Sequence, residues 1–320
     1  MLRKIKDNLK LFFFIIHKWA TKLGIHILPV HYYSPVPDIL ELDKAKDIWA
    51  KKSELPGVAL DINDQANNLE MICRPYLDEY VGNKIYLEAT SKRFGPGFGY
   101  IEAQALHAII RYYKPKTIIE VGCGVSTYCM ICASKENVNE SNQPSKIFCI
   151  EPYPSPKIKT LSELSEIELI TEKVQNVPME FFEKLADSDL LFIDSSHTVK
   201  PGSDVNYLIL EIIPRLKAGV IIHFHDIFLP YDYQHDVLNT FLHWTETSLL
   251  HAFLINNNKV RIIFCMSQLH YERKDILKEV FPEYNPQIDK NGLRNSRYMY
   301  RLFEEQISQH FPSSIYIQVK

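Results

Sequence analysis

The stretch "IIEVGCGVST", residues 118–127, carries a short apolar strand, a glycine turn and the start of a helix. Gly122 and Gly124 permit a tight turn and a close approach of the backbone to a ligand. Ser126 and Thr127 stand where the helix begins, so their amides and hydroxyls are placed to meet an anion. A dinucleotide-binding fingerprint has a third glycine at the position of Thr127, so the turn by itself does not identify the ligand.

Around this turn, short apolar runs alternate with helical segments. The predicted strands are 117–121, 146–151, 167–171, 189–194, 219–226, 259–265 and 314–319. Helices are predicted over residues 204–216 and about 237–255. Such alternation predicts a parallel sheet covered by helices on both faces, in which ligands bind outside the carboxyl ends of the strands.

The composition argues against some classes of protein. With 36 Lys and Arg against 39 Asp and Glu, the formal net charge is −3, which argues against a nucleic-acid partner bound by bulk electrostatics. Most of the six cysteines lie in apolar stretches, as reduced thiols in a cytoplasmic protein do. We therefore expect a cytoplasmic protein that does not bind nucleic acid.

The first 22 residues are basic and amphipathic, with six Lys and Arg and one Asp. The apolar run 11–16 is far shorter than the roughly 20 residues that span a bilayer. One helix face is apolar, because hydrophobic residues recur at three- and four-residue steps: Ile5, Leu9, Phe12, Ile16, Trp19 and Leu23. The helix either docks on its own domain or rests on an anionic membrane, so peripheral membrane association stays open.

Polar residues follow the predicted strands where a binding crevice is expected. Glu151 ends the second strand, and a carboxylate there can accept hydrogen bonds from both ribose hydroxyls of a nucleotide. The alternative for Glu151 is a solvated residue at a strand end. Asp194 and His197 follow the fourth strand, and "HFHD", residues 223–226, ends the fifth.

These motifs together resemble the class I, Rossmann-type S-adenosylmethionine-dependent methyltransferases, and more narrowly the subgroup labelled methyltransferase domain 24. The resemblance rests on "EVGCGVST" from residue 120, "FCIEP" from 148, "LLFIDSSH" from 190 and "GVIIHFHDIFLPYDY" from 219. It covers about residues 90–265. It implies an α/β fold with a doubly wound, mostly parallel, seven-stranded Rossmann-like sheet, an antiparallel closing strand and an N-terminal helical cap.

On this basis the chain of 320 residues is expected to have three parts. Residues 1–30 form an N-terminal amphipathic helix, and residues 31–92 form a helical cap or lead-in. Residues 93–320 form the methyltransferase domain, with an insertion at about 266–312.

The resemblance also implies S-adenosylmethionine as the cofactor, bound by Glu120, Gly122, Gly124, Ser126, Thr127, Glu151, Gln175 and Asp194. Glu120 and the glycine turn would hold the methionine part, with Ser126 and Thr127 near its carboxylate. Glu151 would take the ribose hydroxyls, and Gln175 and Asn176 would lie near the adenine.

Methyl transfer to an alcohol needs help in removing the hydroxyl proton, from a general base or from a metal ion. The candidate catalytic residues are Asp194, His197, His225 and Asp226. Related methyltransferases hold a divalent metal at these strand ends, so Asp194, His225 and Asp226 are tentative ligands for Mg²⁺ or Mn²⁺. The imidazole favours Mn²⁺, Fe²⁺ or Zn²⁺ over Mg²⁺. Without a metal, His197 or His225 would be the base.

A hydrogen-bonded structural network is the alternative for this cluster. His223 lies deeper in the strand and is expected to be a hydrogen-bonded core residue.

The predicted function is methylation of a hydroxyl on a small molecule or glycan. Two alternatives are a non-catalytic scaffold that keeps the cofactor fold and a Rossmann-like hydroxylase or dehydrogenase. Retention of Glu120, the two turn glycines and Glu151 argues against the scaffold. The departure from the dinucleotide fingerprint argues against the dehydrogenase.

Overall fold

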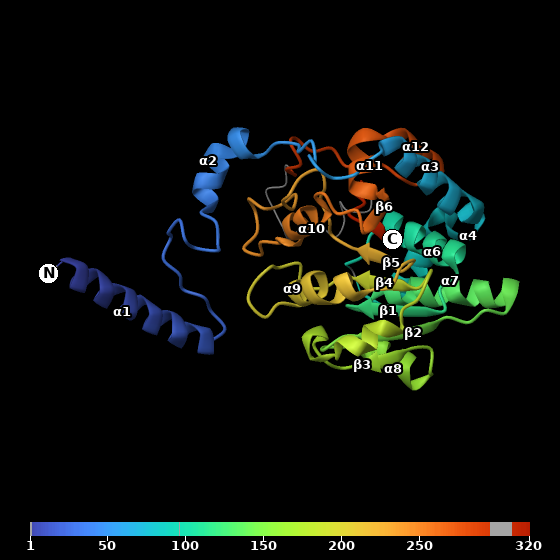
Figure 1. Ribbon diagram of the computed structural model, residues 1–320, viewed down its shortest axis with the longest axis horizontal. Coiled ribbons are helices and arrows are strands. Elements are labelled where there is room, and N and C mark those ends of the chain that lie inside the picture. The colour runs from blue at the N-terminus through green and yellow to red at the C-terminus, as the bar shows by residue number, and fades with distance from the viewer. Residues whose placement is uncertain (1, 96, 295–308) are drawn as a thin grey trace. The chain divides into compact units, whose positions relative to one another are not determined.

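The protein is described here from a computed structural model that covers residues 2–95, 97–294 and 309–320. Contacts within the chain divide it into two compact units, Met1–Trp49 and Ala50–Lys320. The first unit holds helices α1 (Leu2–Lys22) and α2 (Ile39–Trp49), and the second holds the sheet (Figure 1). The domain boundaries predicted after residues 30 and 92 stay predictions, and the insertion at about 266–312 lies in part outside the described residues.

The second unit is built on a seven-stranded sheet of order β3-β2-β1-β4-β5-β7-β6. Its strands are β1 (Thr117–Val121), β2 (Lys146–Ile150), β3 (Glu168–Ile170), β4 (Leu190–Ile193), β5 (Ile221–Phe224), β6 (Val260–Cys265) and β7 (Ile315–Val319). Strands β1 to β5 pair in parallel, and β7 is antiparallel to both β5 and β6. The predicted α/β class with an antiparallel closing strand is therefore confirmed.

The register places the carboxyl ends of the central strands side by side. Val121 at the end of β1 pairs with Ile150 of β2 and with Ile193 of β4, which in turn pairs with Phe224 of β5. The chain runs outward from β1 to β3 and then returns to β4, so the β1/β4 boundary is the point where strand order reverses. In open α/β sheets that point is where ligands bind.

Alternate strand residues pack into cores on the two faces of the sheet. On one face, Ile118 and Phe192 pack in a core with residues of helices α3, α6 and α7. On the other face, Ile119 and Leu191 pack in a core with residues 205–213 and α10. The helices of the second unit are α3 (Ile62–Cys73), α4 (Leu77–Tyr80), α5 (Lys84–Ser91), α6 (Tyr100–Tyr113), α7 (Val125–Ser141), α8 (Pro156–Glu163), α9 (Asp204–Asn206), α10 (Glu246–Leu254), α11 (Met266–Glu272) and α12 (Lys274–Val280).

Two predicted elements are shorter than expected by four residues or more, whereas the other strands agree to within two residues. The helix predicted from about residue 237 begins only at Glu246, because side chains in the preceding segment bond its backbone. Gln234 Oε1 accepts the Trp244 amide at 2.7 Å, and Thr240 Oγ1 accepts the Leu242 amide at 3.0 Å. Strand β5 ends at Phe224 and not at residue 226. No helix in the described part of the chain is long and apolar enough to cross a membrane.

Candidate active site

The turn after β1 lies directly against the end of β4. Gly122 has φ +84°, and a Cβ atom there would come 1.9 Å from the carbonyl oxygen of Asp194. The Gly122 amide donates to the carbonyl of Ile150 at 3.1 Å, and the Asp194 amide donates to the carbonyl of Val121 at 2.9 Å. Glycine at 122 is therefore required both for the backbone conformation and for the space.

Glu120 holds this turn in place through buried hydrogen bonds. Its side chain is fully buried, and it accepts hydrogen bonds from Ser126 Oγ at 2.6 Å, Thr127 Oγ1 at 2.7 Å and Cys149 Sγ at 3.2 Å. Burial raises the pKa of Glu120 to about 7, although these three donors oppose the rise. Thr127 Oγ1 also accepts the amide of Gly124 at 3.0 Å. Three predicted cofactor residues, Glu120, Ser126 and Thr127, thus fix the shape of the turn.

A cleft of about 470 Å³ opens at the carboxyl ends of β1, β2 and β4. Four predicted cofactor residues line it, namely Gly122, Glu151, Gln175 and Asp194. Residues that sequence reasoning missed include Tyr153, Lys173, Ser195, Ser196, Lys200 and Asp204. Five of them lie in loops and Asp204 begins α9, and the fold sets the course of these segments, so no local pattern marks them.

Two cleft side chains are held by the backbone. Glu151 Oε1 accepts the Tyr153 amide at 2.8 Å. Gln175 Nε2 donates to the carbonyl oxygen of Gly202 at 2.8 Å. The neighbouring Asn176, also expected near an adenine, instead donates to Glu172 at 3.0 Å and is not among the lining residues.

The four predicted catalytic residues meet beside this cleft. His197 Nε2 lies 3.2 Å from Asp194 Oδ1 and 3.6 Å from Asp226 Oδ2. His225 Nδ1 lies 3.4 Å and 3.5 Å from the same two oxygens. Because Asp194 also lines the cleft, the cluster adjoins the cofactor side of the site.

The backbone turns these side chains toward one another after their strands have ended. His197, four residues after β4, and Asp226, two residues after β5, both have φ +55°. This left-handed conformation is uncommon outside glycine, although Asp and His adopt it more readily than most residues. It takes Asp226 out of the strand alternation that would have placed its carboxylate on the face opposite His225.

A buried glutamate that sequence reasoning missed orients His197. Glu246, at the start of α10, is 1% exposed, and its Oε2 lies 2.8 Å from His197 Nδ1. Trp244 packs on the same imidazole, with ring centroids 4.7 Å apart. Because Nδ1 is engaged by a carboxylate, Nε2 is directed at Asp194 and Asp226. Glu246 lies 49 residues from His197 in the sequence, so only the fold reveals the pair.

The other carboxylate oxygen of Asp226, Oδ1, has a partner from the segment before β7. Ser313 Oγ donates to Asp226 Oδ1 at 2.9 Å, and the Ser313 amide donates to Glu102 Oε1 at 2.9 Å. Glu102 of α6 is 4% exposed, and burial raises its pKa. These contacts join the segment before β7 to the cluster.

Acidic side chains set the protonation of the two imidazoles. Burial disfavours their charge, but Asp194 and Glu246 raise the pKa of His197 well above its usual range. Asp226 and Asp194 likewise overcome burial and raise the pKa of His225 to about 9. In return, His225 and His197 overcome desolvation and hold the pKa of the half-buried Asp194 carboxyl well below its usual range. The cluster therefore stabilises positive charge, whether that charge is carried by protons or by a bound cation.

The cluster also has the donor set of a metal site. One ligand atom each from Asp194, His197 and Asp226 lies within 4.8 Å of the others. The metal ligands predicted from the sequence are Asp194, His225 and Asp226, whereas the structure groups the two aspartates with His197. A carboxylate on the far nitrogen of the imidazole, here Glu246, is the usual second partner of a metal-binding histidine.

His223 is a core residue, but it is not hydrogen-bonded as expected. It is fully buried, and its ring stacks on Tyr316 with centroids 4.3 Å apart. Neither ring nitrogen has a hydrogen-bond partner among the described residues. Burial, together with the neighbouring His225, lowers the pKa of His223 well below its usual range, so the ring is neutral.

Comparison with known protein families relates the central part of the chain to methyltransferases. The family model described as a methyltransferase domain matches residues 119–227, from β1 to just beyond β5. A protein of Archaeoglobus fulgidus, described as uncharacterized, is 30% identical in an alignment of length 195 that covers 59% of this chain and 85% of that protein.

Two solved structures of plantazolicin methyltransferases were also found. The BamL complex with a triazolic desmethylPZN analog and SAH is 13% identical, with a TM-score of 0.37, covering 80% of this chain and 97% of that one. The BpumL complex with SAH is 13% identical, with a TM-score of 0.33, covering 81% and 98%.

Proposed function

The chain belongs to the methyltransferase-domain family, and from that premise we propose that it transfers the methyl group of S-adenosylmethionine to a hydroxyl of a small molecule or glycan. The observation that carries the proposal is the double position of Asp194. It lines the cofactor cleft and also belongs to the cluster with His197, His225 and Asp226. A reacting group placed beside Asp194 would therefore meet the cofactor on one side and proton-accepting groups on the other.

The cleft suits the nucleoside part of the cofactor. Glu151 is at the end of β2, where a carboxylate can accept hydrogen bonds from both ribose hydroxyls. Gly122 leaves the floor of the cleft open, because it carries no side chain.

The cluster suits the removal of a proton from the acceptor. As the hydroxyl oxygen attacks the methyl carbon, the carbon–sulfur bond breaks, its electron pair stays on sulfur and the hydroxyl proton passes to Nε2 of His197. Glu246 holds Nδ1 and so fixes the tautomer that leaves Nε2 as the acceptor. S-adenosylmethionine would bring a cationic sulfonium, and near Asp194 that charge would oppose the protonation of His197 and favour the neutral imidazole that can accept the proton.

The same residues fit a divalent ion, which we propose as the second form of this mechanism. Two carboxylate oxygens and one imidazole nitrogen, from Asp194, Asp226 and His197, suit Mn²⁺, Fe²⁺ or Zn²⁺ better than Mg²⁺. A bound ion would supply Lewis-acid activation of the acceptor hydroxyl. Glu246 would then orient the imidazole as a ligand.

Isothermal titration calorimetry with S-adenosylhomocysteine tests the cofactor part of the proposal. Wild type should bind it and should give no heat with NAD. Glu151→Ala should weaken binding by about 1.5–3 kcal/mol through the loss of charge-assisted hydrogen bonds. Glu163→Ala, at the exposed end of α8, is the control and should bind like wild type. No heat with S-adenosylhomocysteine would refute the proposal and favour the non-catalytic scaffold. Heat with NAD alone would favour the dehydrogenase.

Incubation of metabolite and glycan extracts with methyl-labelled cofactor identifies the acceptor by mass spectrometry. Asp226→Asn keeps the shape of the side chain and removes its charge, so turnover should collapse while cofactor affinity stays nearly unchanged. Loss of activity with a chelator and its recovery with Mn²⁺ supports the metal form, and indifference to the chelator supports the histidine base. Normal turnover of Asp226→Asn would refute a catalytic role for the cluster.

A further inference from the structure

The N-terminal unit, residues 1–49, has almost no core of its own. Among its described side chains, those of residues 9–49, Ala20 is the only buried hydrophobic residue. Helix α2 buries no residue. Neither hydrophobic cluster of the protein includes a described residue of this unit. The apolar side chains of α1 are therefore not accounted for by packing within the unit.

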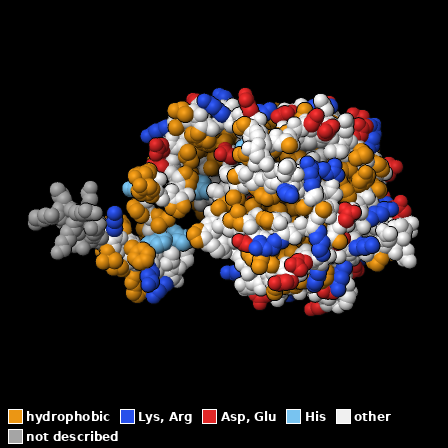
Figure 2. Space-filling view, viewed as in Figure 1, with side chains coloured by type: hydrophobic (Ala, Val, Ile, Leu, Met, Phe, Trp, Pro, Cys, Tyr) orange, Lys and Arg blue, Asp and Glu red, His pale blue; other side chains and the backbone are white. Residues whose placement is uncertain are grey.

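Exposed hydrophobic side chains are concentrated in this unit. Fourteen of them lie between Leu9 and Tyr33, whereas 12 lie in the whole described part of Ala50–Lys320. Those 12 are scattered along the chain, with Phe241 and Leu242 as the only pair of sequence neighbours. Figure 2 shows hydrophobic side chains on the surface of the N-terminal unit. Such a concentration marks an interaction surface.

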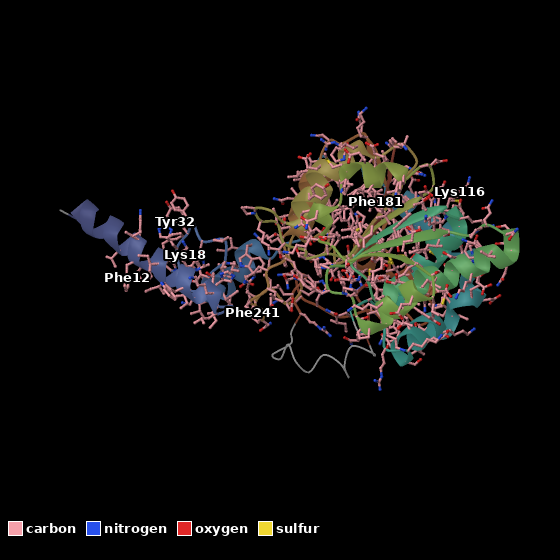
Figure 3. The ribbon with its side chains drawn as sticks, turned by 90° about the horizontal axis from the view of Figure 1, so that it is seen from below. Phe12, Lys18, Tyr32, Lys116, Phe181 and Phe241 are labelled. Carbon is pink, nitrogen blue, oxygen red and sulfur yellow. The ribbon has the colours of Figure 1, made fainter. Side chains whose placement is uncertain are left out.

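One face of helix α1 is apolar, although Leu11 and Phe14 lie among the lysines on the other side. Leu9, Phe12, Ile16 and Trp19 follow one another at steps of three or four residues and so share a face. Lysines 10, 18 and 22 fall off that face at the helical period of 100° per residue. Phe12 and Lys18 both project from the helix (Figure 3). The chain continues past the helix with further exposed rings, Tyr32 at 81% and Tyr33 at 79%.

We propose that α1 is a membrane-binding helix that lies in the plane of an anionic lipid surface. Its charge is complementary to such a surface, because residues 1–22 carry six Lys and Arg against one Asp. Its apolar face enters the boundary between headgroups and acyl chains, where Trp and Tyr are preferred. An in-plane position follows because no described helix is long and apolar enough to cross the bilayer. The proposal does not depend on the methyl-transfer proposal.

Vesicle flotation of the full chain tests this assignment. The protein should float with vesicles that contain phosphatidylglycerol and should bind phosphatidylcholine vesicles much more weakly. Lys10→Gln with Lys18→Gln should lower binding to the anionic vesicles about 25-fold, at roughly fivefold for each lysine. Lys157→Gln with Lys159→Gln, two exposed lysines of α8, is the matched control and should leave binding unchanged.

A second pair of variants tests the apolar face. Phe12→Gln with Trp19→Gln should lower binding by more than about tenfold, whereas the exposed pair Leu164→Gln with Leu210→Gln should not change it. Thermal unfolding and sedimentation velocity are measured on the same proteins. Failure of wild type to float overturns the proposal. Loss of thermal stability in the Phe12 and Trp19 variant also overturns it, because α1 would then dock on the chain's own second unit. Dissociation of a dimer in that variant overturns it as well, because the partner of α1 would then be a second copy of the chain.

Discussion

Replacing Glu120 by Gln should make the stability of the protein less sensitive to alkaline pH. The Glu120 carboxyl is fully buried beneath the glycine turn, and burial raises its pKa from 4.5 to about 7. An acid with a raised pKa contributes stability that is fully present below its unfolded pKa and is lost as pH rises through its folded pKa. Above pH 7 the protein therefore holds a buried charge that it does not hold at pH 5.

The size of the effect follows from the two pKa values. A difference from 4.5 to about 7 corresponds to about 3 kcal/mol, and about 2.5 kcal/mol of it falls between about pH 5 and pH 8.5. Glutamine does not titrate, and it can still accept from Ser126 while its amide donates to Thr127 Oγ1. The free energy of unfolding of Glu120→Gln minus that of wild type should thus rise by about 2.5 kcal/mol over this pH range.

Urea unfolding followed by tryptophan fluorescence at several pH values measures this difference. Glu163→Gln, at the exposed end of α8, is the matched control and should differ from wild type by a constant amount. A flat difference for Glu120→Gln would show that its three hydrogen-bond donors keep the carboxylate charged throughout. Burial of the carboxyl would then not outweigh those donors.

Four further outcomes follow from the site. Gly122→Ala should cost more than about 2 kcal/mol of stability, seen as a lower unfolding temperature, because its Cβ would meet a carbonyl oxygen at 1.9 Å. Although burial opposes it, Asp226 and its neighbours raise the pKa of His225 to about 9; a histidine NMR titration should show this pKa, and it should fall in Asp226→Asn. The stability that the His225 proton contributes is fully present below about pH 6.5 and is lost as pH rises through 9. Glu246→Gln should lower methyl transfer about 100-fold, measured with the acceptor from the labelled extract, with S-adenosylhomocysteine affinity unchanged in calorimetry. His223→Leu should stabilise the protein by about 1 kcal/mol in urea unfolding, since it removes a buried imidazole without a partner among the described residues.

The sheet was predictable because its signals are local. Each strand is a run of apolar residues bounded by polar or glycine-containing turns, as in "TIIEVGCG" from residue 117. Because helices cover both faces of the sheet, the side chains on both faces of a strand are apolar, and the strand appears in the sequence as one continuous apolar run. Residues 237–245 were predicted as helix because they have an ordinary apolar pattern. The hydrogen bond from the Trp244 amide to Gln234, which competes with a helix, cannot be inferred from that pattern.

The site was predictable where it follows directly on a strand. Gly122, Glu151, Asp194 and the acid and imidazole after β5 all stand one or two residues beyond a strand end, and the register brings those ends together. Glu246 and Glu102 were missed, because each reaches the cluster from a helix far away in the sequence.

The position of β7 has a consequence for how the chain acquires its fold during synthesis. In the described sheet, strand β6 pairs only with β7, and β7 pairs on its other side with β5. Because β7 is translated after both strands, the parallel strands β1 to β5 can assemble on the ribosome before β7 exists. Until then the edge of β5 is unpaired and β6 has no strand partner. Unpaired edges of this kind attract other chains. The time the ribosome spends on residues 266–314 therefore sets how long a nascent chain needs protection, and slow translation of that segment should increase its capture by chaperones.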